Sequence, residues 1–156
     1  MGWFGYGLYD GDETQTCHLT FIKQAIPSLK SDDIFDMLGS RKTKIPQHLI
    51  PEFKKGIPNI LRKIKFPRNI LAWDEDNAIE WQMLLSLFVD NNLGIPRKIL
   101  VRGMLANHVL LGKHAEDFNE PSRRRAAIKR FMKKVDAEFC SVKARQDISK
   151  VLKSAK

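Results

Sequence analysis

The chain has 156 residues, a formal net charge of +9, 43% hydrophobic and 29% charged residues. This composition is typical of a globular protein and excludes a chain that is disordered throughout. Cys17 and Cys140 are too few for a disulfide framework, and no apolar stretch is long enough to span a membrane. Because the N-terminus also has no signal-peptide pattern, we expect a single cytoplasmic domain over residues 1–156.

The first segment, MGWFGYGLYDGDETQ, alternates glycine with aromatic residues. It lacks the third glycine of a dinucleotide-binding loop and the lysine of a P-loop. It also lacks the glycine and the distal glutamate that would complete a calcium loop. We expect it to pack across one end of the domain. The alternative is a partner surface formed by Trp3, Tyr6 and Tyr9.

The stretch WFGYGLYDGDET resembles the start of uncharacterised small bacterial proteins that open W-G-x-G-x-F-D-N-D-x-A. Gly5, Gly7, Asp10 and Asp12 match this pattern, and Tyr9 takes its aromatic position. Phe4 is an insertion after Trp3, and Gly11 replaces the Asn. The resemblance covers about fifteen residues and implies a helical continuation but no activity.

Two helices are expected in the first forty residues. Asp12 is a suitable N-cap for a helix that ends at Pro27. Ser31 is suited to cap a short helix that Gly39 closes. The following segment, residues 41–68, holds prolines at 46, 51, 58 and 67, which favour short helices over a long one.

The centre of the chain predicts an αα-hairpin. Asp74 is a suitable N-cap, and the segment AIEWQMLLSLFVD is apolar on nearly all sides, as in a buried helix. NNLGIP then predicts a turn with Gly94 at the exit, followed by a helix over residues 96–111.

The C-terminal part predicts two more helices. In residues 121–139 the apolar side chains recur at helical spacing: Ile128, Phe131, Met132, Val135 and Phe139. A last helix is expected from about Ser141 to Ser154. No segment has the alternation of a strand, so the expected fold is all-α, with about six or seven helices around the central hairpin.

The positive charge is concentrated in two segments, residues 41–68 and 119–156, each with a net charge of +8. In the helix over residues 121–139 the cations fall opposite the apolar stripe, so they can face a partner while the stripe packs on the core. The candidate binding residues are Arg123, Arg124, Lys129, Arg130, Lys133 and Lys134. RKTK at 41–44 and RKIKFPR at 62–68 are candidates to extend this surface.

No catalytic or metal motif is present. His18, His48, His108 and His114 form none of the short metal-binding patterns, so we expect solvated or capping histidines and no metal or cofactor. Glu80 and Arg102 lie on the two hairpin helices, where a structural ion pair is the simplest expectation. A catalytic carboxylate with a raised pKa is the alternative.

These features favour a non-enzymatic binding or regulatory protein that uses its basic surface on an acidic protein partner, such as an enzyme that it inhibits or modulates. One alternative is sequence-independent nucleic-acid binding through the helix over residues 121–139. The other is an enzyme with a pocket near Glu80, Arg102 and His108.

Overall fold

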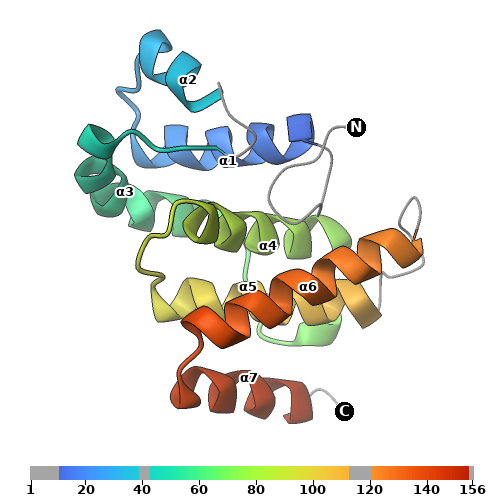
Figure 1. Cartoon of the computed structure of the whole chain (residues 1–156). Coiled ribbons are helices and arrows are strands. Elements are labelled where there is room, and N and C mark those ends of the chain that lie inside the picture. Colours follow the sequence, from blue (N-terminus) through green and yellow to red (C-terminus); the bar gives the residue numbers. More distant parts are fainter. Residues whose placement is uncertain (1–10, 39–42, 113–120, 155–156) are drawn as a thin grey trace.

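The computed structural model describes residues 11–38, 43–112 and 121–154 (Figure 1). Every regular element in these ranges is helical, as the sequence predicts. The elements in chain order are α1 (Gly11–Ala25), α2 (Ser31–Leu38), the short 3-10 helix η1 (Gln47–Leu49), α3 (Ile50–Lys63), a second 3-10 helix η2 (Ile70–Ala72), α4 (Glu75–Asp90), α5 (Arg97–Gly112), α6 (Pro121–Phe139) and α7 (Val142–Ser154). The expected packing of the N-terminal segment lies outside the described residues.

The antiparallel pair α4 and α5 forms the centre of the core, which confirms the predicted αα-hairpin (Figure 1). All residues from 81 to 90 of α4 are buried. A Cβ on Gly103 would lie 2.6 Å from the Cβ of Leu85, so the glycine allows the two helices to pack closely. Inside the pair, the buried amide of Gln82 donates a 2.5 Å hydrogen bond to Asn107.

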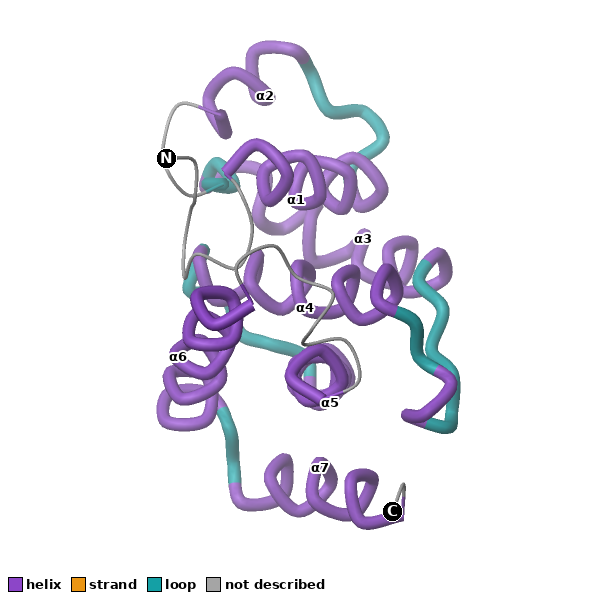
Figure 2. Tube along the Cα trace, turned by 90° about the vertical axis from the view of Figure 1, so that its right-hand side faces the viewer, coloured by secondary structure: helices purple, strands orange, loops and turns teal. Residues whose placement is uncertain are grey.

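The remaining helices pack on the two sides of this hairpin. Helix α1 contacts both α3 and α4, whereas α6 and α7 contact α5. Figure 2, which shows the fold turned by 90°, places α3 and α6 on opposite sides of the hairpin and α7 beyond α5. The side chains of one face of α6 are fully buried: Ile128, Phe131 and Val135.

Local signals set several helix ends where the sequence predicts them. The Asp74 carboxylate accepts a 2.7 Å hydrogen bond from the backbone N–H of Asn77 at the start of α4. The Ser141 hydroxyl accepts one from the N–H of Ala144 at the start of α7. The turn after α4 differs from the prediction, which places Gly94 at the exit. The residue with a left-handed backbone conformation is Asn92, with φ of 51°.

The prediction of short helices between the prolines is wrong for α3, which continues for 14 residues. Pro51 lies in its first turn, and Pro58 lies inside the helix. Pro58 and Lys54 are exposed, so the carbonyl that loses its usual N–H donor can bond to water. Buried Gly56 lies against the backbone of Ala25, and this contact with α1 holds the helix in place.

Candidate functional site

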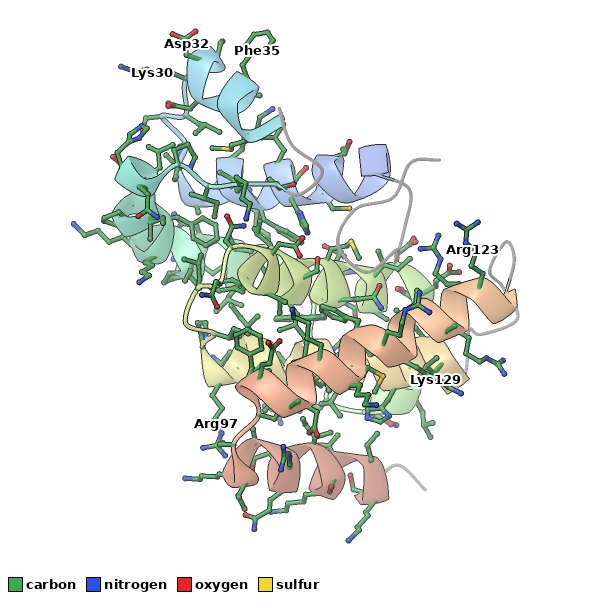
Figure 3. The ribbon with its side chains drawn as sticks, viewed as in Figure 1. Lys30, Asp32, Phe35, Arg97, Arg123 and Lys129 are labelled. Atoms are coloured by element: carbon green, nitrogen blue, oxygen red, sulfur yellow. The ribbon has the colours of Figure 1, made fainter. Side chains whose placement is uncertain are left out.

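The outer face of α6 carries the cations that the sequence predicts as binding residues. Arg123, Lys129, Arg130, Lys133 and Lys134 are exposed and Arg124 is half-buried. Figure 3 shows Arg123 and Lys129 projecting from α6. Because the opposite face of α6 packs on the core, this basic face points away from the hairpin on a fixed helix. The structure thus confirms the exposure of five of these residues, whereas their role stays a prediction.

Three of these cations have no ion-pair or hydrogen-bond partner in the described part of the chain: Lys129, Arg130 and Lys133. They stand at positions i, i+1 and i+4, so two of them lie one helical turn apart and the third lies beside them. Their like charges repel one another, and a negative partner that covered them would relieve this repulsion. We call Lys129, Arg130 and Lys133 the α6 triad.

Carboxylates interrupt the basic surface beside the triad. On α6, Glu138 lies 3.4 Å from Lys134 in an i, i+4 pair. Asp136 accepts a 2.9 Å hydrogen bond from Arg145 of α7, which joins the two helices. Both pairs are solvent-exposed, so they add little to stability. Their carboxylates place negative charges beside the positive charges of the α6 triad.

In the described residues, the other basic segments do not extend this face. Arg41 and Lys42 lie outside the described residues, and the Lys44 ammonium donates to the carbonyl of Asp90 at the end of α4. Residues 62–68 belong to the end of α3 and the loop that follows it. Figure 2 places that segment on the side of the hairpin opposite α6. The expectation of one continuous basic surface is therefore wrong for residues 62–68.

The expected ion pair between Glu80 and Arg102 does not form. Glu80 is exposed, and its pKa is raised by partial burial and by the nearby carboxylates of Asp74 and Asp76. The Arg102 guanidinium instead stacks over aromatic rings, 3.7 Å from the centroid of Phe66 and 5.0 Å from that of Trp81. Such cation–π contacts stabilise an arginine without a carboxylate partner.

The proposed pocket of Glu80, Arg102 and His108 does not appear as one cavity in the described residues. Arg102 lines an open groove between α5 and α7, and neither Glu80 nor His108 belongs to the lining that the structure describes. His108 is half-buried, and burial lowers its pKa. The three side chains are therefore not brought together around one visible binding site.

Among the histidines that the structure describes, His18 forms the most hydrogen bonds, whereas the sequence predicts a solvated or capping residue. It is fully buried, with Nδ1 at 3.0 Å from the Thr43 hydroxyl and Nε2 at 2.7 Å from the Ser86 hydroxyl. Nε2 also lies 3.1 Å from the carbonyl of Met83. A proton on Nε2, donated toward Met83 and Ser86, satisfies these contacts, while the Thr43 hydroxyl donates to Nδ1.

This arrangement keeps the imidazole of His18 neutral. Burial lowers its pKa from 6.5 to about 4, and the hydrogen bond to the Met83 carbonyl opposes this effect only in part. A serine hydroxyl bonded to an imidazole is a pair that nucleophilic enzymes use, but Ser86 is only 3% exposed and His18 is 0% exposed. We assign the cluster a structural role in joining α1, the segment before η1, and α4.

The remaining candidates that the structure describes add no chemical site. His48 lies on the surface, 3.3 Å from a carboxylate oxygen of Asp33. Cys17 and Cys140 are half-buried, and neither forms a disulfide. Within the ranges that the structure describes, no three histidine, cysteine or acidic residues gather as a metal site would require, and no helix has the length and apolar character to cross a membrane. His114 and the aromatic residues Trp3, Tyr6 and Tyr9 lie outside those ranges.

No protein-family model matches the chain, and comparison with curated proteins and with solved structures finds no similar one. The resemblance at the N-terminus therefore stays a prediction.

Proposed function

We propose that the chain is a non-enzymatic binding or regulatory protein of the cytoplasm, and that the outer face of α6 engages an acidic protein partner. Inhibition or modulation of that partner is the role this kind of contact would serve. The observation that carries the proposal is the α6 triad, three exposed cations without a partner in the described chain, on a helix whose other face is buried.

The charge pattern around the triad favours a protein over a phosphate backbone. Asp136 and Glu138 stand on the same helix. A continuous polyanion would be repelled by these carboxylates, whereas a protein surface can oppose them with its own cations. The triad would then face acidic side chains of the partner, and charge complementarity would set its orientation.

Capture of the partner by the immobilised protein tests this proposal. The test variant is Lys129→Glu, Arg130→Glu and Lys133→Glu, which reverses the triad. The matched control is Lys54→Glu, Lys55→Glu and Lys63→Glu, because these three exposed lysines lie on α3 and their reversal changes the net charge equally. Both variants are first compared with the wild type by circular dichroism and thermal unfolding.

The proposal predicts that an acidic protein bound by the wild type binds at least about tenfold more weakly to the triad variant, because like charges would then face each other. The α3 control should retain the wild-type affinity. Equal losses in the two variants would show that only net charge matters and would contradict the assignment to α6.

Sequence-independent binding of nucleic acid is the second candidate, because the same three unpaired cations could contact phosphates. Fluorescence anisotropy of labelled duplex DNA across a salt series distinguishes the two. Contact with three phosphates predicts a slope of log affinity against log salt of about −2.7 on duplex DNA, which the triad variant should abolish. No binding at low salt would eliminate this candidate and leave the protein partner.

A further inference from the structure

A second surface feature lies on the other side of α5 from α6. The helices α5 and α7, together with the loop after α3, enclose an open groove of about 320 Å³. Its floor is apolar and is formed by Phe66, Val101, Leu105 and Val151. We call this feature the α5–α7 groove. Its volume is at the lower end of the range for sites that bind small molecules.

Arg102 provides the groove with a positively charged group that is held in place. Its guanidinium lies 3.7 Å from the ring centroid of Phe66, which fixes the plane of the group against the floor. Within the described residues it has no carboxylate or carbonyl partner, so its N–H donors are free to meet a ligand. Partial burial of this guanidinium lowers its pKa.

The charges around the groove leave it positive. Arg97 forms an ion pair with Asp147 of α7 across one end of the groove, so these two charges offset each other. Figure 3 shows Arg97 near the N-terminal end of α7. Lys98 is exposed and has no partner in the described residues. Lys98 and Arg102 are thus two uncompensated cations beside an apolar floor.

We propose that the α5–α7 groove binds a small organic carboxylate that carries an apolar group. The planar guanidinium of Arg102 matches the two oxygens of a carboxylate and can donate two parallel hydrogen bonds. Lys98 adds a positive charge at the rim, and the apolar group lies on the floor beside Val101 and Leu105. Inorganic phosphate would use the cations but not the floor, and so should bind more weakly.

This site is separate from the α6 triad, since Figure 2 shows α6 on one side of α5 and the loop after α3 on the other. A partner seated on the triad would not cover the groove. The two proposals can therefore fail independently.

Titration of the ¹⁵N-labelled full chain with 3-phenylpropanoate tests the proposal by chemical-shift changes. Saturable changes should centre on the amides of Val101, Leu105 and Val151. The matching neutral compound, 3-phenylpropanamide, and inorganic phosphate should each bind at least about tenfold more weakly. Equal affinity for the amide, equal affinity for phosphate, or no saturable change with 3-phenylpropanoate would each overturn the proposal.

Substitutions locate the contact. Arg102→Gln removes the charge and the fork of donors, and should weaken 3-phenylpropanoate by about tenfold to a hundredfold. Arg102→Lys keeps the charge but not the fork of donors, so its affinity for 3-phenylpropanoate should lie between those of the wild type and Arg102→Gln. Lys23→Gln removes one charge from α1, which does not line the groove, and should leave the affinity unchanged. Unchanged affinity in folded Arg102→Gln, checked by its spectrum, would overturn the proposal.

A variant with the opposite expected effect guards against losses caused by misfolding. Asp147→Asn removes the carboxylate that competes for the cations of the groove and frees Arg97. Binding of 3-phenylpropanoate should then tighten, by about threefold. Weaker binding in this variant would contradict the placement of the ligand's negative charge among these cations.

Discussion

The buried side chain of His18 should make the protein less stable as the pH falls from 7 to 5. The imidazole is 0% exposed and has a pKa of about 4, against 6.5 as its ordinary value. Well above pH 6.5 it is neutral in both the folded and the unfolded chain, so its titration does not change the free energy of unfolding there. As the pH falls toward 4, the unfolded chain binds the proton and the folded chain does not, and stability is lost.

The size of this effect follows from the two pKa values. The loss between pH 7 and pH 5 is about 2 kcal/mol, and it reaches a limit of about 3 kcal/mol below pH 4. Urea unfolding at pH 7, 6 and 5 measures it in the wild type. Other groups also titrate in this range, so the informative quantity is the difference from a variant without the imidazole.

His18→Gln is that variant, because the glutamine amide can still donate toward the Met83 carbonyl. We expect it to be less stable than the wild type at pH 7, since its fit in the buried site is poorer. The difference between the two proteins should shrink by about 2 kcal/mol at pH 5. Parallel pH profiles, or an NMR titration of His18 with a pKa near 6.5, would refute the reasoning.

Four further substitutions test the packing and the helix ends by urea unfolding. Gly56→Ala should lower the free energy of unfolding by about 3 kcal/mol or more, because the new Cβ would overlap the backbone of Ala25. Gly94 has open space around it, so Gly94→Ala should stay within about 0.5 kcal/mol of the wild type. Asp74→Ala should lower the free energy of unfolding by about 1 kcal/mol, because the backbone N–H of Asn77 would lose its hydrogen-bond acceptor. No change would mean that the cap contributes nothing. Asn92→Gly should gain about 0.5 kcal/mol, because its φ of 51° favours glycine, and a loss would contradict that reading of the turn.

The sequence predicts the elements that depend on neighbouring residues. The bounds of α6 and the cap of α4 follow from local patterns: an apolar stripe at helical spacing after Pro121, and an Asp before an apolar run. The buried character of α4 also follows, because a helix that is apolar on nearly all sides must pack on all sides.

Features that depend on distant contacts could not be predicted in the same way. Pro58 remains inside α3 because Gly56 of that helix packs against α1, and no local pattern contains that contact. His18 is buried because Thr43 and Ser86 supply its partners from two distant segments. Similarly, Glu80 and Arg102 carry opposite charges on neighbouring helices, but the rings beside Arg102 take the place of the carboxylate.

The central claim is that the outer face of α6 is the partner surface, and site-specific photo-crosslinking tests it most directly. Ala126 is exposed on that face, and replacing it by p-benzoylphenylalanine leaves every cation in place. The control is the same residue at Gln47, which is exposed in η1. In an extract of the expressing cells, the account predicts a crosslink to an acidic protein from position 126 and none to that protein from position 47. Crosslinking of that protein from position 47 alone, or of nucleic acid from position 126, would contradict it.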